Sequence, residues 1–434
     1  MNDSVASDSK MARALAFLAP FSILLSVIFA QRKTFFLPGG SALYFGTASV
    51  VLVAATGCIW GLATGRLPRP SVMARRAWPL LLFYGLSLLI LAISVARTHL
   101  ATTTIHLVAN YVLLYLAAPG AYYLAWTQRK QFRKGIAALM LAIMVIALVF
   151  VLAEVLGFLH VNNPLTAAMM SYDKLNLPLF EWRWYQTPGE TFRVASFSFD
   201  PNFLGIFMLI VAVWAASGKD HLKTRVFCFV SSALVLVLSA SRGALLAAVV
   251  VAVAWVLIYR RSITGRFRQL ADTPQKRFGI IALLAALMIL VLLGIAPGIT
   301  HRVVDSFATI RAEGITSKTI DLVLSGRGEI WSNALRLIRQ APLGHWLTER
   351  LVSARAIHND YLSALVSGGP VLLASLVALI IWMGRRKMPA RSRALALSLA
   401  LICAVTGLVY NTFQFSAVLP LILFTLGANE KEPV

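Results

Sequence analysis

A histidine at the edge of an apolar run is the residue of this chain best suited to act as a base. His358 is followed by Asn359 and Asp360 in the sequence ARAIHNDYLSAL, and an apolar run begins at once. An ionisable group at the edge of a membrane span is costly to place, so it marks a candidate functional site. Histidine ordinarily has a pKa of about 6.5 and can accept a proton near neutral pH. The other interpretations are a metal ligand and an interfacial histidine that only satisfies its hydrogen bonds.

The sequence around His358 disfavours the metal. No histidine or carboxylate accompanies it at the spacing of HxxxH or HExxH, so we expect neither a metal nor another cofactor. For Asn359 we predict a role as a local cap or as an orienting residue. Asp360 has two interpretations: it caps the following helix, or it holds the imidazole of His358 in its productive tautomer.

Three arginines lie at positions that membrane topology does not require. Arg193 precedes the sequence DPNFLG, Arg242 interrupts the apolar sequence LVLSASRGALLAA, and Arg327 opens the sequence RGEIWSNALRLIRQ. Guanidinium groups bind phosphate oxygens through paired hydrogen bonds. The set therefore predicts a substrate that carries phosphate in or near the lipid, together with a base that deprotonates a nucleophile.

Each arginine segment also has a structural interpretation. In the structural interpretation, Arg193 is a solvated cation in a loop. Asn202, which follows it in the sequence, is then a helix cap. Ser241 would help form a tight turn from which Arg242 reaches toward lipid headgroups. Arg327 would lie in the first turn of its helix, where the helix dipole disfavours a cation. Because a residue placed against its local preference more often serves a ligand, Arg327 stays among the candidates.

Membrane-spanning helices must position these residues. The chain has 434 residues, of which 59% are hydrophobic and 13% charged, whereas soluble domains have about 25% charged residues. Long runs that are apolar on every face indicate helices and exclude a β-barrel. We therefore predict an all-α polytopic membrane protein with about twelve spans in a single domain, residues 1–434. The spans lie near 14–30, 42–63, 77–96, 105–126, 135–159, 202–217, 226–240, 244–259, 278–296, 361–383, 394–411 and 413–428.

Lysine and arginine predict the orientation of these spans. Alternate connections such as TQRKQFRK and GRRKMPARSR concentrate basic residues, which places them and both termini in the cytoplasm. The long loops 160–201 and 297–360 then face outward. The second loop has apolar residues at helical spacing, which predicts an amphipathic helix on the membrane surface. The net charge of +23 is mainly this orientation signal, so nucleic acid is not an expected partner.

The ordered motifs resemble the bacterial O-antigen ligase and polymerase family. They are RVASFSFDPNFLG, SASRGALL, SGRGEIWSNALRLIRQAPLGHW and AIHNDYLSALVSGG, and they follow one another within residues 190–370. The resemblance implies a glycosyltransferase that works outside the cytoplasmic membrane on a glycan linked to undecaprenyl diphosphate. By motif, Arg193 and Arg242 would bind the diphosphate, with Arg327 beside them, and His358 would act as the base. Asn202, Ser241, Asn359 and Asp360 would support them.

The resemblance leaves two acceptors open. In ligases the acceptor is a sugar hydroxyl of the lipid A core, and in polymerases it is a second lipid-linked repeat unit. The ligase pattern expects Gly, Thr or Tyr three positions after Gly369, where this chain has Leu372, and GHW replaces a glycine-rich sequence. The leading prediction is a metal-independent, inverting ligase of the inner membrane with its site on the periplasmic face. Polymerase is the alternative.

A transporter or lipid flippase is the competing class of function. It would predict interrupted helices, charges near the middle of the membrane and internal repeats. In this sequence the polar residues gather at one predicted face instead. That distribution favours chemistry at the face over passage through the membrane.

Overall fold

The computed structural model describes most of the apolar runs and part of the connections. The described residues are 2–28, 33–37, 41–64, 70–98, 102–127, 129–156, 201–217, 221–239, 241, 243–255, 257, 311, 327–348, 352–353, 357–386, 390–410 and 418–430. Arg193, Arg242 and the predicted span 278–296 lie outside them, as does most of both long loops.

Helices make up almost all of the described structure, because a backbone in lipid must satisfy its own hydrogen bonds. They are α1 (Asn2–Ile28), α2 (Phe45–Ala63), α3 (Pro70–Thr98), α4 (Thr102–Thr127), α5 (Arg129–Val155), α7 (Pro201–Ala216), α8 (Leu222–Ser239), helix Gly243–Trp255, α12 (Gly328–Gln340), α14 (Asp360–Gly384), α15 (Ala390–Thr406) and α16 (Val418–Ala428).

Four stretches of helix are long and apolar enough to cross a membrane within the described part of the chain. They are Arg75–Arg97, Gly135–Ala153, Leu222–Ser239 and Asp360–Gly384, and six shorter apolar helices accompany them. Together they support a helical membrane protein. The total of about twelve spans stays a prediction.

A short β-hairpin departs from the all-α expectation. Strands β1 (Lys33–Leu37) and β2 (Ser41–Tyr44) pair antiparallel, with Leu37 opposite Ser41 and an irregularity between Lys33 and Phe35. The connecting sequence PGG is a turn signal. Hydropathy does not show so short an element, because it lies between two apolar runs.

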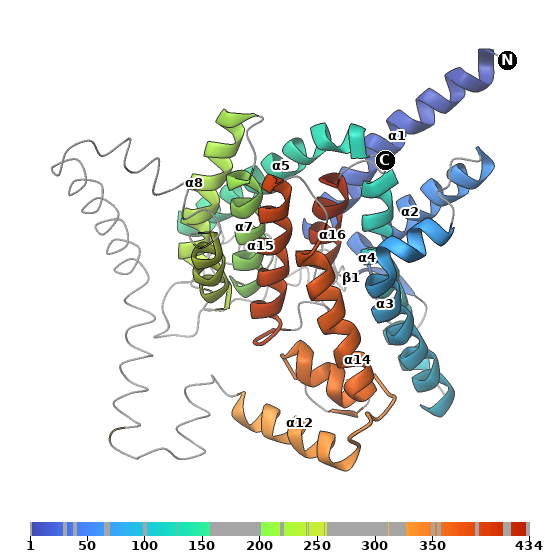
Figure 1. Ribbon diagram of the computed structural model, residues 1–434, viewed down its shortest axis with the longest axis vertical. Coiled ribbons are helices and arrows are strands. Elements are labelled where there is room, and N and C mark those ends of the chain that lie inside the picture. Colours follow the sequence, from blue (N-terminus) through green and yellow to red (C-terminus); the bar gives the residue numbers. More distant parts are fainter. Residues whose placement is uncertain are drawn as a thin grey trace.

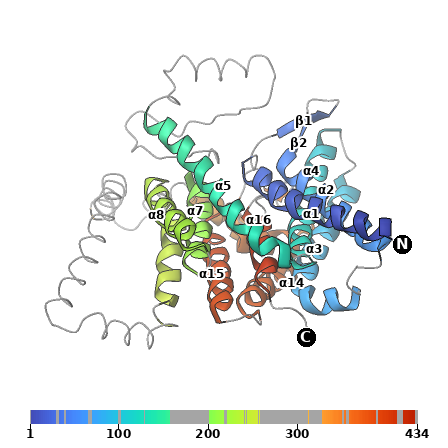
Figure 2. The same cartoon turned by 90° about the horizontal axis from the view of Figure 1, so that it is seen from above.

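Helix α14 begins two residues after His358 and contacts three other helices. It packs against α3 on one side and α15 on the other, and α12 packs against it as well. Figure 1 shows α12 at one end of the bundle, with the start of α1 and the end of α16 toward the opposite end. Figure 2 shows α5 crossing between the pair α7 and α8 and the group formed by α1 to α4.

A buried ion pair joins the chain at the other end of α14. The guanidinium group of Arg386 contacts the carboxylate of Glu430, and their side chains are 11% and 4% exposed. The same guanidinium group donates to the hydroxyl of Tyr122 on α4 and to the main-chain oxygen of Arg76 on α3. Three helices and the segment after α16 are thereby held together away from α12.

Candidate functional site

Two of the predicted site residues, Arg193 and Arg242, lie outside the described residues. The structure does place Arg327, which is half-buried at the start of α12. Its guanidinium carbon lies 5.2 Å from the centre of the ring of Tyr410. This is a cation–π distance, and it leaves the edge of the guanidinium group for other partners.

Tyr410 also contacts the segment that follows the first long loop. Its hydroxyl donates to Oδ1 of Asn202 over 2.7 Å, and its ring lies 6.2 Å from that of Phe203. Asn202 is the second residue of α7, which begins at Pro201 as expected of a proline. The side-chain oxygen of Asn202 is therefore turned to a tyrosine from a distant part of the chain.

The hairpin that carries Arg242 meets the same tyrosine. Ser241 is buried, and its hydroxyl donates to the main-chain oxygen of Asn202 over 3.4 Å. A Cβ atom on Gly243 would lie 2.6 Å from the ring of Tyr410, so only glycine allows this approach. Asn202, Gly243 and Arg327 thus all lie against Tyr410, which the sequence analysis did not select.

His358 is exposed and has a left-handed backbone, with φ of 52°. This conformation is uncommon for a residue other than glycine and occurs preferentially at functional sites. The residue before it is fixed from α12, because the indole nitrogen of Trp331 donates to the main-chain oxygen of Ile357 over 3.2 Å. The imidazole is thus presented from a short segment that is held at both ends.

The second anchor of this segment is Asn359, the N-cap of α14. Its Oδ1 accepts from the main-chain nitrogens of Tyr361 and Leu362 at 3.0 Å each. Its Nδ2 donates to the main-chain oxygen of Leu408 over 2.9 Å. The capping role predicted for Asn359 is confirmed, and the capping interpretation of Asp360 is wrong because Asn359 occupies that position.

The turn after α15 connects the histidine segment with the arginine segment. The main-chain nitrogen of Asp360 donates to the oxygen of Gly407 over 2.8 Å, in the same turn that accepts from Asn359. This turn ends at Tyr410, under Arg327. A single four-residue turn therefore sets the position of His358 relative to Arg327.

Helix α14 is broken at Gly369, and the loop after α12 fills the break. Gly369 has φ of 64° and ψ of −156°, and Pro370 follows it. The main-chain oxygens of Val366 and Ser367 accept instead from the nitrogens of His345 at 3.0 Å and Trp346 at 2.7 Å. Broken membrane helices are tolerated where neighbours satisfy the freed backbone groups in this way.

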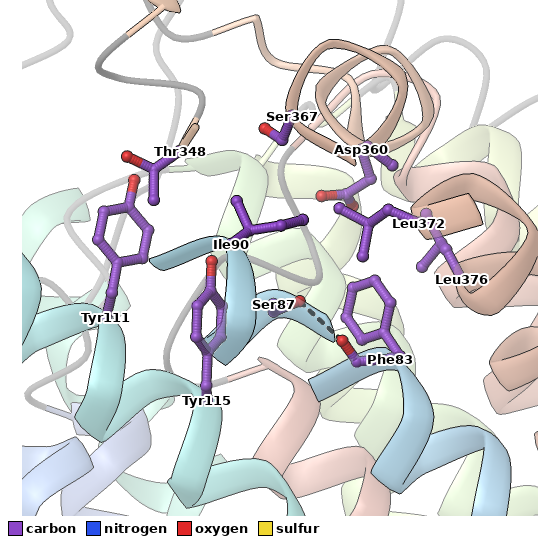
Figure 3. A pocket seen from close by; sticks show the side chains of 11 residues that line it. Phe83, Ser87, Ile90, Tyr111, Tyr115, Thr348, Asp360, Ser367, Leu372 and Leu376 are labelled. Carbon is purple, nitrogen blue, oxygen red and sulfur yellow. Dashed lines mark hydrogen bonds between the residues drawn. The ribbon is translucent and has the colours of Figure 1, made fainter. Parts of the chain in front are cut away.

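The side chain of Asp360 points away from solvent and is 3% exposed. With Thr348 from the loop after α12 and Tyr111 and Tyr115 from α4, it lines a pocket between α3, α4 and α14 (Figure 3). Its predicted role as the partner that fixes the tautomer of His358 stays a prediction.

Residues 227–377 match the O-antigen ligase family. The matched segment contains Arg242, Arg327 and His358, and the resemblance seen in the motifs is confirmed there. No curated protein matches the chain.

The O-antigen ligase match and the apolar helices together support a membrane glycosyltransferase of the O-antigen ligase and polymerase type. Asn202 and Tyr410 lie outside the matched segment, yet the structure joins both to Arg327 within it. Tyr410 was missed because the apolar run 394–411 was interpreted as one span. The signal that could have found it is orientation, since the connection between the last two spans is expected on the outward side.

Proposed function

We propose that this protein transfers a glycan from undecaprenyl diphosphate to a sugar hydroxyl of the lipid A core, at the periplasmic face of the inner membrane. The observation that carries the proposal is the O-antigen ligase match over residues 227–377, which contains the predicted base and two of the three predicted phosphate-binding arginines. The convergence of Asn202, Gly243 and Arg327 on Tyr410 supports it further.

The reaction we propose is one displacement at the anomeric carbon. The acceptor oxygen forms a bond to that carbon while the bond to the diphosphate oxygen breaks, so the anomeric configuration inverts. The proton of the acceptor hydroxyl passes to the imidazole of His358. The negative charge that grows on the diphosphate is stabilised by the guanidinium groups of Arg193, Arg242 and Arg327.

A polymerase is the second candidate, and Leu372 favours it. The ligase pattern expects Gly, Thr or Tyr at this position. Leu372 is 7% exposed and lines the pocket of Asp360. A polymerase would use the same donor chemistry with a second lipid-linked repeat unit as the acceptor.

One experiment separates the two candidates. Purified protein in lipid nanodiscs receives an undecaprenyl-diphosphate glycan together with either lipid A core or further donor alone. A single addition to lipid A core supports the ligase, a ladder of products supports the polymerase, and no glycan transfer in either arm contradicts both.

Two controls test the mechanism in the same assay. His358→Ala should reduce transfer to background, whereas His221→Ala, which removes another exposed histidine with positive φ, should leave it unchanged. Transfer by His358→Ala at the rate of the natural protein would exclude His358 as the base. Full activity in EDTA is expected, and loss of activity there would contradict the metal-independent reaction.

A further inference from the structure

Among the described residues, no arginine lines the pocket of Asp360. The pocket lies between α3, α4 and α14, whereas Arg327 and Tyr410 belong to the start of α12 and to the turn after α15. A carboxyl group offers no positive charge to a diphosphate and accepts hydrogen bonds from hydroxyl groups. The pocket is therefore unsuited to the phosphate end of a donor and suited to an uncharged polyhydroxyl group.

Hydroxyl groups, aromatic rings and the aliphatic side chains of Ile90, Leu372 and Leu376 complete the pocket. Figure 3 shows Tyr111 and Tyr115 side by side on α4, with Thr348 and Ser367 above them and Asp360 across the opening. The two rings lie 5.7 Å apart at their centres. Tyrosines one helical turn apart provide apolar faces for the C–H groups of a sugar and polar ends for its hydroxyls.

One polar group in the pocket, the hydroxyl of Thr348, indicates that a ligand binds there. Thr348 is 4% exposed, and its hydroxyl has no hydrogen-bond partner among the described residues. Its position is fixed, because its main-chain nitrogen donates to the hydroxyl of Ser94 on α3 over 2.9 Å. Buried hydroxyls are nearly always paired, so a group that enters the pocket is needed to satisfy this one.

We propose that this pocket is the subsite for the sugar that accepts the glycan. The inference rests on the proposed function and adds where the acceptor binds. Asp360 is two residues from His358 along the chain, so a sugar held by Asp360 and Thr348 is bound next to the segment that carries the proposed base.

The test measures the KM for each substrate separately. In Thr348→Val the shape of the side chain is kept and the hydroxyl is lost, so we expect the KM for lipid A core to rise roughly three- to tenfold. The KM for the undecaprenyl-diphosphate glycan should stay within about twofold. Thr348→Ser, which keeps the hydroxyl, should restore most of the acceptor KM, and Asp360→Asn should raise it about tenfold or more.

Thr425→Val is the matched control, because the hydroxyl of Thr425 is equally buried but already donates within α16 to the main-chain oxygen of Leu421 over 2.7 Å. It should change neither KM. If the unmodified protein makes a ladder, the same measurement uses the second lipid-linked unit as acceptor, with the same expectation.

Several outcomes would overturn the inference. An unchanged acceptor KM in Thr348→Val would mean that the pocket holds water only, and a parallel change in both KM values would mean a structural role. Saturation-transfer NMR with core oligosaccharide released from lipid A gives a readout without turnover, and equal signals from the unmodified protein and Asp360→Asn would also contradict it. Absence of transfer by the unmodified protein would instead count against the proposed function.

Discussion

The guanidinium group of Arg327 lies over the ring of Tyr410, with 5.2 Å between the guanidinium carbon and the ring centre. The hydroxyl of the same tyrosine is held by Oδ1 of Asn202. The ring thus covers one face of the guanidinium group, whose N–H groups point along its own plane and not into the ring. This arrangement suits a residue that must offer donors to phosphate without moving when the substrate arrives.

The two contacts of Tyr410 can be removed one at a time. Tyr410→Phe keeps the ring under Arg327, so the KM for the diphosphate donor should rise about twofold or less. Tyr410→Leu also removes the cation–π contact, which is worth roughly 0.5–2 kcal/mol, so a rise of about two- to thirtyfold is expected. Tyr361→Phe is the control, since it loses one hydrogen bond to the main-chain oxygen of Ala404 elsewhere. Equal effects of Phe and Leu at position 410 would refute this account.

The close contact between Gly344 and Gly369 predicts that a larger residue at either position destabilises the fold. A Cβ atom on Gly344 would lie 2.3 Å from the nitrogen of Gly369, and one on Gly369 would lie 2.3 Å from the carbonyl of Leu343. Both glycines also have positive φ. We expect either alanine variant to give little or no monodisperse protein in detergent, or to have a melting temperature well below that of the natural protein.

Gly85→Ala is the control for these glycines, because nothing lies within 4 Å of the added atom. Removing a glycine from a helix should leave stability unchanged or raise it by about 0.5–1 kcal/mol. Normal yield and melting of Gly369→Ala would show that the loop after α12 does not pack into the break of α14.

Asn359 should contribute both to the stability of α14 and to its attachment to the turn after α15. Asn359→Ala loses the cap, worth about 0.5–2 kcal/mol, and the hydrogen bond to Leu408, worth about 0.5–1.5 kcal/mol. Asn359→Ser can cap but cannot reach Leu408, so its thermal stability should recover further than its transfer rate. A serine variant with full transfer activity would show that the contact with Leu408 does not position His358.

The ion pair between Arg386 and Glu430 can be tested by a double-mutant cycle. Glu430→Gln leaves the buried guanidinium group without its charged partner, which should cost about 3 kcal/mol or more of unfolding free energy. Arg386→Gln alone should be similarly destabilising. The double variant should be less destabilised than the sum of the single variants, by more than about 1 kcal/mol, and additive losses would contradict the pairing.

The sequence predicts the helices well because hydropathy along the chain largely determines them. The ends of the helices are harder to predict, and the run 394–411 is an example. Gly407, Leu408 and Val409 are as apolar as the helix before them, although α15 ends at Thr406 and the next residues form a turn. Hydropathy cannot distinguish an apolar turn from an apolar helix, so the residues that join the two halves of the site were not foreseen.

The candidate site could be predicted only as separate segments. The types of Arg327 and His358 indicate phosphate binding and base chemistry, but their common support in the turn 407–410 depends on contacts between distant parts of the chain. The break in α14 had a local signal in the sequence GGP, since a residue before proline avoids the helical conformation. That signal did not show which loop would satisfy the freed carbonyl groups.

The joint between the loop after α12 and the break in α14 is made of main-chain atoms. Its hydrogen bonds run from the nitrogens of His345 and Trp346 to the oxygens of Val366 and Ser367, and its closest approach is between two glycines. Because main-chain atoms form these hydrogen bonds, they constrain the types of the surrounding side chains only weakly. An enzyme built in this way can change the residues that line its outward loops, and with them the sugars it accepts, while the loop keeps its place on the membrane helix.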